Sequence, residues 1–169
     1  FIKLMNKKYE DFLYVFHSTE SQRSNLEHLI GKSQINNTEI ISDDKIKDHI
    51  LKKSIFAVSK SGTISIEISK RKIPSIIIYK MNFINFLIVK MLVKIKYANI
   101  LNIAAGQMII PELLQSKCNS KQIYKLVSSF LEDQNKIKKQ ISNTEKVLES
   151  FRTKNLPTDL VSDILKNQL

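Results

Sequence analysis

The sequence predicts an α/β fold with a mostly parallel β-sheet and helices on its faces. Short runs rich in β-branched and aromatic residues alternate with helix-like segments between residues 12 and 94. This alternation is typical of βαβ units, in which a helix joins two parallel strands. The run SIIIYK at residues 75–80 is largely apolar, as in strands that are covered on both faces. The last third of the chain is polar and helical instead.

Strands and helices alternate in this prediction as far as residue 94. The helix over 43–54 has acidic residues in its first turn and lysines in its last, which the helix dipole favours. The helix over 63–72 contains many β-branched residues, but Pro74 follows it and a strand begins directly afterwards. In order, the expected elements are a strand over 12–18, a helix over 20–32 with Leu26, Leu29 and Ile30 on one face, a strand over 38–42, the helix over 43–54, a strand over 54–59, the helix over 63–72, the strand over 75–80 and an amphipathic helix over 84–94.

The segment NILNIAAGQMIIPELLQ, residues 99–115, fits neither a helix nor a strand along its whole length. We interpret it as a loop followed by a short helix that begins at Pro111, since proline is common in the first turn of helices. After it, residues 120–152 predict two helices and residues 157–169 a capped terminal helix. Polar or special residues stand among the apolar ones of the segment: Asn102, Gly106, Gln107 and Glu112.

Composition limits the classes of protein to which the chain can belong. The chain has 169 residues, of which 43% are hydrophobic, enough for one domain with a core. It begins with Phe1, so we expect a piece of a longer protein. Cys118 is the only cysteine, which excludes a disulfide within the chain and favours a reducing compartment. No metal site is expected, because the three histidines lie in different elements without metal-ligand spacing: His17, His28 and His49.

The formal net charge of +11 has two interpretations. The lysines are spread over solvated faces, or they attract an anionic partner such as phosphate, nucleic acid or a membrane surface. The apolar run at residues 83–93 is about half as long as a membrane span requires and contains Lys90, so we expect no transmembrane helix. It forms either a core helix whose lysines extend to solvent or a surface that meets lipid headgroups. The lysines concerned are Lys80, Lys90, Lys94 and Lys96.

A glycine stands at the corner between the strand over 54–59 and the helix over 63–72, in the triplet Ser61-Gly62-Thr63. Ligands of parallel sheets bind beyond the carboxyl ends of the strands, and free amides at a helix N-terminus hold phosphate well. Glu67, one turn further along, could accept hydrogen bonds from ribose hydroxyls. The alternative is an ordinary helix cap, with Ser or Thr at the N-cap and Glu in the first turns.

Three sequence blocks, taken together and in this order, point to a particular protein family. They are SGTISIE at 61–67, IPSIIIYK at 73–80 and FLIVKMLVKIKYANILNIAAGQMIIPELLQ at 86–115. Together they resemble the C-terminal half of lipid-A-disaccharide synthases, which carry SGTATLE-like and PELLQ-like blocks. The resemblance implies the two-domain GT-B architecture. Residues 1–118 would form a Rossmann-like domain that binds the UDP-sugar donor, truncated at its N-terminus, and residues 119–169 would be helices that close the fold.

The resemblance also implies an activity. The family transfers 2,3-diacylglucosamine from its UDP derivative to 2,3-diacylglucosamine 1-phosphate, with inversion and without a metal or other cofactor. The enzyme would work in the cytoplasm of a Gram-negative bacterium, on the inner face of the inner membrane. Its acceptor-side domain and catalytic base would precede Phe1, so we expect the chain alone to be inactive.

Site residues follow from the same resemblance. Ser61, Gly62 and Thr63 would approach the diphosphate or sugar of the donor, Glu67 its ribose, and Asn102 the active-site cleft. Lys80 and Gln107 would belong to the donor site, and Lys90, Lys94 and Lys96 to the membrane surface. Four residues depart from the family pattern and put donor positioning in question: Lys80 for Arg, Leu101 for Pro, and Gln107 and Met108 for an Arg-Glu pair.

Two other functions stay open at this point. The first is another GT-B transferase that uses a UDP-sugar, although the NILNIAAG and IIPELLQ blocks are not expected there. The second is a non-catalytic, basic α/β module that binds nucleic acid. Such a module needs aromatic side chains beside its lysines for base stacking, and here the aromatic residues lie mostly at strand and core-like positions.

Overall fold

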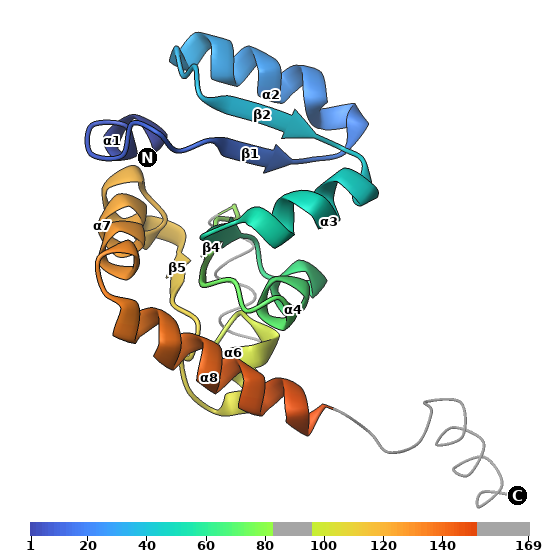
Figure 1. The fold of residues 1–169 in the computed structure, drawn as a ribbon, viewed down its shortest axis with the longest axis vertical. Coiled ribbons are helices and arrows are strands. Elements are labelled where there is room, and N and C mark those ends of the chain that lie inside the picture. The colour runs from blue at the N-terminus through green and yellow to red at the C-terminus, as the bar shows by residue number, and fades with distance from the viewer. Residues whose placement is uncertain (83–95, 152–169) are drawn as a thin grey trace, which may run out of the picture.

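The computed structural model describes residues 1–82 and 96–151, and it confirms the α/β fold class (Figure 1). Every pair of neighbouring strands in this part of the chain is parallel. The strands are β1 (Tyr14–His17), β2 (Thr38–Ile41), β3 (Ala57–Ser59), β4 (Ser75–Tyr79) and β5 (Glu112–Leu114). The helices are α1 (Ile2–Met5), α2 (Glu20–Ser33), α3 (Asp44–Lys53), α4 (Thr63–Lys70), α6 (Ile100–Ala105), α7 (Ser120–Leu131) and α8 (Gln134–Ser150), with a 3₁₀ turn, η1 (Gln115–Lys117), after β5.

The described strands form two sheets rather than the single sheet that the sequence predicted. One sheet contains β1 and β2, and the other has the order β3-β4-β5. In Figure 1, α2 lies along the first sheet, while α7 and α8 run beside the second. Both sheets are thus parallel, and each is flanked by helices.

The segment expected to hold a short helix from Pro111 forms a strand instead. The Pro111 carbonyl accepts a hydrogen bond from the Ile77 amide, and β5 then pairs in parallel with β4. Ile110 and Leu113 are buried there, so packing against the sheet outweighs the local preference of proline for a helix start. Earlier in the segment, Asn99 is the N-cap of α6, and its side chain accepts a hydrogen bond from the Leu101 amide.

Little of the apolar face expected on helix α2 is buried against the rest of the protein. None of the residues of α2 is buried, and Leu29 is 50% exposed. The neighbours Leu26 and Ile30 are half-buried. The sequence predicted the element and its bounds well, but not how little of it packs on the sheet.

The second sheet is the core of the molecule. On one face of β4, Ile76 packs with Met5, Ile123 and Val127, which brings α1 and α7 together. On the other face, Ile77 packs with a second cluster. Burying each of these side chains stabilises the fold by roughly 1.5–3 kcal/mol. As predicted, β4 is covered on both faces. The second cluster consists of Ile77, Leu101, Ile109 and Ile110.

Helix α8 is fixed to the start of β4 by one side chain. The Gln140 Oε1 accepts the Ser75 amide at 2.7 Å, and its Nε2 donates to the Ser75 carbonyl at 2.9 Å. Gln140 is 5% exposed, so these bonds satisfy two backbone groups that water does not reach. A side-chain amide thus replaces a strand partner at this point.

Two predicted elements lie outside the described residues: the amphipathic helix over 84–94 and the terminal helix over 157–169. Among the helices that are described, none is long and apolar enough to cross a membrane.

Candidate functional site

The carboxyl ends of β3 and β4 form one edge of the second sheet, because the two strands are parallel. Lys60 follows β3 directly, and its Nζ lies 5.1 Å from the centroid of the Tyr79 ring at the end of β4. Lys80 comes next in the chain and is exposed. The edge therefore carries two lysines beside the Ser61–Thr63 triplet.

Helix α4 begins at this edge without a side-chain cap. Its N-cap residue is Gly62, and no side chain within residues 1–82 and 96–151 bonds to the first amides of the helix. Gly62 has φ +150° and ψ −168°, a backbone conformation that L side chains rarely adopt. The alternative of an ordinary Ser or Thr cap is therefore wrong. A helix N-terminus with uncapped amides and an exposed Thr63 is suited to an anion.

Ser61 connects this corner to the polypeptide before α6. Its hydroxyl donates to the Ala98 carbonyl at 2.7 Å. The Ala98 amide in turn donates to Glu112 Oε2 at 2.8 Å. The position of the corner is thus coupled to the first residue of β5.

Glu112 is a buried carboxylate, 8% exposed, and both of its oxygens accept hydrogen bonds. Its Oε1 accepts the Asn99 amide at 2.9 Å and Asn102 Nδ2 at 2.7 Å. The Asn99 side chain donates to Ser65 Oγ at 2.8 Å, which reaches the first turn of α4. Buried charges are tolerated when hydrogen bonds satisfy them, so this network supports the corner from beneath.

Asn102, expected in the active-site cleft, lies beneath the surface with an exposed fraction of 0%. Its Oδ1 accepts the amides of Ile109 and Ile110 at 2.9 and 2.8 Å. Its Nδ2 donates to the Ile110 carbonyl and to Glu112. Both polar atoms of its side chain are therefore hydrogen-bonded to the backbone before β5 and to Glu112. These bonds hold that segment in position.

Gln107 is not brought to the corner by any described contact. It is exposed and follows Gly106, which ends α6 with φ +65°. Ala98, the partner of Ser61, lies before the opposite end of the same helix. Helix α6 therefore separates Gln107 from the Ser61–Thr63 triplet.

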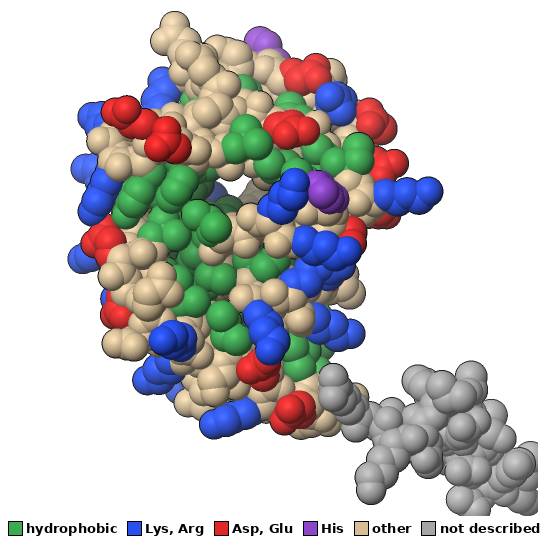
Figure 2. All heavy atoms as spheres, viewed as in Figure 1, with side chains coloured by type: hydrophobic (Ala, Val, Ile, Leu, Met, Phe, Trp, Pro, Cys, Tyr) green, Lys and Arg blue, Asp and Glu red, His purple; other side chains and the backbone are tan. Residues whose placement is uncertain are grey.

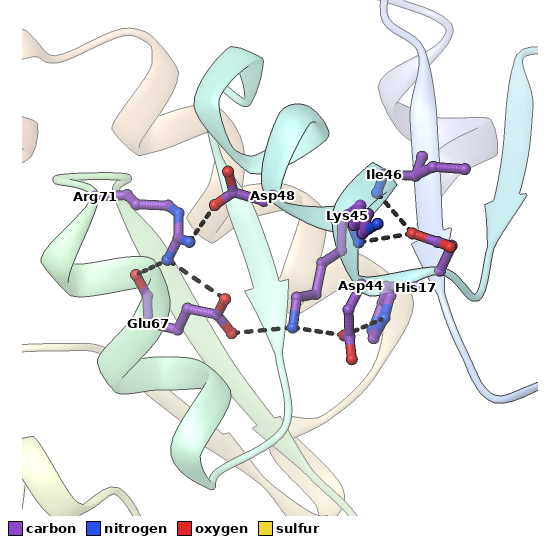
Figure 3. A network of polar contacts seen from close by, with 9 residues as sticks. His17, Asp44, Lys45, Ile46, Asp48, Glu67 and Arg71 are labelled. Atoms are coloured by element: carbon purple, nitrogen blue, oxygen red, sulfur yellow. Dashed lines mark hydrogen bonds and ion pairs between the residues drawn. The ribbon is translucent and has the colours of Figure 1, made fainter.

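Glu67 lies in a row of charged side chains between α3 and α4 (Figure 3). Its Oε2 lies 3.4 Å from Lys47 Nζ, and its Oε1 lies 3.4 Å from an Arg71 nitrogen. Lys47 also contacts Asp44 Oδ1 at 2.9 Å, and His17 Nε2 lies 3.9 Å from that oxygen. The Glu67 side chain remains 29% exposed, so it is paired but still accessible.

The charges of this row stabilise one another. The hydrogen bond from Lys47 lowers the pKa of the Asp44 carboxyl, and the same bond raises the pKa of Lys47. Hydrogen bonds from Lys52 and then Arg71 lower the pKa of Asp48 to about 2. These groups are therefore ionised at neutral pH, and the row joins α3 to α4 electrostatically.

A cavity of about 960 Å³ opens beside these residues. Figure 2 shows the opening, with hydrophobic side chains around it and lysine and histidine at one side. Its polar lining near the edge consists of His17, Lys47, Lys60, Thr63 and Glu67. The structure thus brings Gly62, Thr63 and Glu67 to one region, with Lys60 and Lys47 as cations that the sequence analysis missed. Lys60 could have been found, because it adjoins Ser61.

The surface lysines are only partly described. Lys90 and Lys94 lie outside the described residues, while Lys96 is exposed with its Nζ 5.7 Å from the Tyr97 ring centroid. Within residues 1–82 and 96–151, no cluster of three or more His, Cys, Asp and Glu side chains could hold a metal ion.

Comparison with known proteins gives a consistent result. The sequence profile of the lipid-A-disaccharide synthetase family matches residues 1–161. The lipid-A-disaccharide synthase of Rickettsia canadensis is 36% identical over 131 residues, which cover 76% of this chain and 34% of the relative. That of Rickettsia prowazekii is 33% identical over 130 residues, with the same shares.

A more distant organism gives a longer match. The lipid-A-disaccharide synthase of a Sulfurihydrogenibium species is 32% identical over 160 residues, 90% of this chain and 41% of the relative. The matched part thus spans about a third to two fifths of the length of these relatives. Since the family profile covers almost the whole chain, the chain belongs to the lipid-A-disaccharide synthetase family.

Proposed function

We propose that this chain is the donor-binding part of a lipid-A-disaccharide synthase and that it holds UDP at the carboxyl edge of β3 and β4. The observation that carries the proposal is the uncapped N-terminus of α4 at Gly62. Its free amides point the positive end of the helix dipole at the space where a diphosphate would lie. Membership in the family supports the choice of a UDP-sugar over other anions.

Each side chain at the edge has a role in this proposal. The Thr63 hydroxyl and the Lys60 and Lys80 ammonium groups would bind diphosphate oxygens. Glu67 would accept hydrogen bonds from the ribose while keeping Lys47 and Arg71 as partners. Ser61 would approach the diphosphate or sugar of the donor, while the bond from its hydroxyl to Ala98 holds the corner in place.

The proposed reaction transfers 2,3-diacylglucosamine from UDP to the 6-hydroxyl of 2,3-diacylglucosamine 1-phosphate. The hydroxyl attacks the anomeric carbon with inversion, and UDP leaves. Negative charge grows on the departing diphosphate, where the α4 amides and the two lysines stabilise it electrostatically. The catalytic base and the acceptor site would lie in the remaining part of the full-length protein, so the chain alone would not catalyse the transfer.

Two further predicted site residues have roles in this proposal. Asn102 would act as a positioning residue, because its bonds to Glu112 and to the Ile109–Ile110 backbone fix the network beneath the corner. Gln107 would meet the donor from the other end of α6. Residues 1–118 would form the donor domain, with the segment 119–169 closing it.

A peripheral place on the inner face of the inner membrane completes the proposal. The acyl chains of both substrates are held in a membrane while their sugars react at its surface. Lys90, Lys94 and Lys96 would provide the contact with anionic headgroups.

The test is the substitution Thr63→Val, measured by calorimetric titration with UDP. Valine keeps the shape of threonine and removes the hydroxyl, so a charge-assisted hydrogen bond worth about 1.5–3 kcal/mol is lost. UDP should bind roughly 10- to 100-fold more weakly.

The matched control is Thr38→Val, which makes the same chemical change at the amino end of β2. It should leave UDP binding unchanged. Equal affinity of the Thr63→Val variant and the parent would exclude the diphosphate position beside α4.

A further inference from the structure

The charged row between α3 and α4 alternates in sign, with Glu67 at its centre (Figure 3). On one side, Lys47 Nζ lies 3.4 Å from Glu67 Oε2 and 2.9 Å from Asp44 Oδ1. On the other side, Arg71 lies 3.4 Å from Glu67 Oε1 and forms an ion pair with Asp48. Each carboxylate oxygen of Glu67 therefore has its own cation, and a second acid holds each of these cations.

Helix α3 supplies three members of the row from one of its faces. Asp44, Lys47 and Asp48 are spaced by three and four positions, so their side chains lie on the same side of the helix. The Lys47 side chain is 18% exposed, less than the 29% of Glu67. The ammonium group is thus more enclosed than the carboxylate that it contacts, and its position is fixed by two acids from two helices.

The two cations attract the Glu67 carboxylate in different directions. Among the described residues that line the cavity of about 960 Å³, Lys47 and Glu67 are present and Arg71 is not. Arg71 follows Glu67 by one turn, away from the helix start at Gly62, and it also donates to the Glu67 carbonyl at 3.2 Å. Lys47 therefore holds the carboxylate at the cavity, while Arg71 draws it along the helix.

We propose that Lys47 is a positioning residue that keeps Glu67 directed at the cavity and thereby sets a preference for ribonucleotides over deoxynucleotides. The inference rests on the proposed function, in which Glu67 accepts hydrogen bonds from the ribose hydroxyls. Lys47 acts through Glu67 and does not itself contact the ribose. One ammonium at 3.4 Å leaves Oε2 with lone pairs for a ligand hydroxyl.

Removal of the Lys47 charge would change the balance of forces on Glu67. Asp44 and Glu67 contact the same ammonium, so without it the two carboxylates would repel each other. Arg71 would still attract Glu67, and the carboxylate would turn away from the cavity. A ribose would then have to order the side chain on binding, which lowers the affinity by about 2- to 12-fold.

The test is a calorimetric titration of the full-length protein with UDP and with 2′,3′-dideoxy-UDP, which lacks both ribose hydroxyls. The parent should bind UDP about 10- to 100-fold more tightly than the dideoxy compound. In Lys47→Met, this preference should fall by about 2- to 12-fold. The loss of a positive charge beside the diphosphate weakens both ligands alike, so the ratio of the two affinities reports the positioning of Glu67 alone.

Two further variants make the measurement specific. Lys45→Met makes the same chemical change at an exposed position of the same helix and should leave the preference unchanged. Lys47→Arg keeps the positive charge and should retain the preference of the parent. If Lys47→Met does not fold, Lys47→Gln removes the charge with a polar side chain and replaces it in the same titrations.

The outcomes separate this inference from the function on which it rests. A parent that binds UDP and dideoxy-UDP equally would exclude the ribose role of Glu67, and the inference would fall with it. A parent that prefers UDP, with an equal preference in the uncharged Lys47 variant, would overturn the inference alone. A preference in Lys47→Arg as low as in Lys47→Met would also overturn it, because the shape of lysine rather than its charge would then matter.

Discussion

Glu67 has a cation at each carboxylate oxygen, and this determines how a ligand hydroxyl can reach it. A ribose would share the carboxylate with Lys47 and Arg71 rather than displace them. Sharing is possible because a carboxylate accepts about four hydrogen bonds. The ion pairs also hold the side chain in one place, which reduces the ordering cost of binding.

The substitution Glu67→Ala should therefore weaken UDP binding. The loss of charge-assisted hydrogen bonds to ribose costs about 1.5–3 kcal/mol, measured by calorimetric titration. Glu39→Ala removes an exposed carboxylate from β2 and should not change the affinity. If Glu67→Ala binds UDP as tightly as the parent, Glu67 serves only the ion pairs.

Glu112 leads to a different prediction, because its carboxylate is buried beneath the corner. In Glu112→Gln, an amide NH₂ takes the place of one carboxylate oxygen and faces an N–H donor from Ala98, Asn99 or Asn102. An unsatisfied buried donor costs about 1–3 kcal/mol, so the free energy of unfolding should fall by that amount in urea titrations.

The same variant should also bind UDP more weakly, because Ser61 depends on Ala98 for its position. The control Glu39→Gln makes the same change on an exposed strand position and should alter neither quantity. Unchanged stability of Glu112→Gln would show that the network relaxes without cost.

At the level of elements, α3 and α4 are joined by charge rather than by packing alone. Arg71 ends α4, and it bonds to Asp48 on α3. The pKa of Asp48 is about 2 in the folded protein, below its ordinary value of 3.8. A carboxyl with a lowered pKa adds stability above its unfolded pKa, and this contribution disappears as the pH falls through the folded pKa.

We therefore expect Asp48→Asn to destabilise the protein at pH 5 and above, and to have a shrinking effect between about pH 4 and pH 2. Urea unfolding of parent and variant across this range checks the prediction. Because the pair is at the surface, the difference should also decrease in salt. If the parent and the variant still differ as much in free energy of unfolding at pH 2, the effect does not come from the charge of Asp48.

The sequence predicted elements best where local signals and packing agreed. Acids and lysines at the ends of α3, and Pro74 after α4, gave helices close to those observed. It failed at Pro111, where the pairing of β5 with β4 outweighed a local helix signal. It also could not predict the Glu112 network, because Asn99, Asn102 and Ser65 meet only in three dimensions.

At the level of the whole molecule, the net charge of +11 predicts salt-sensitive attraction to anionic surfaces. We expect the chain to sediment with anionic vesicles at low salt and to be released at high salt. The double substitution Lys90→Glu and Lys94→Glu should reduce binding, since each lysine near the surface contributes about 1 kcal/mol.

The matched control is Lys138→Glu with Lys139→Glu, which changes the net charge equally on exposed positions of α8. If the two double variants bind vesicles equally, only net charge matters and the segment around Lys90 is not a specific contact. Equal binding of the Lys90 and Lys94 variant and the parent at low salt would exclude this surface altogether.

The packing of α1 on α7 has a consequence for synthesis on the ribosome. Lys8 and Glu132 form an ion pair across 124 positions of sequence, and Met5 is buried among α7 side chains. At a translation rate of about 5–20 residues per second, the partner emerges roughly 6–25 s after α1. During that interval the apolar side of α1 has no native surface to cover it. We therefore expect the nascent α1 segment to stay open to chaperone binding until α7 emerges, and slower translation would prolong its exposure.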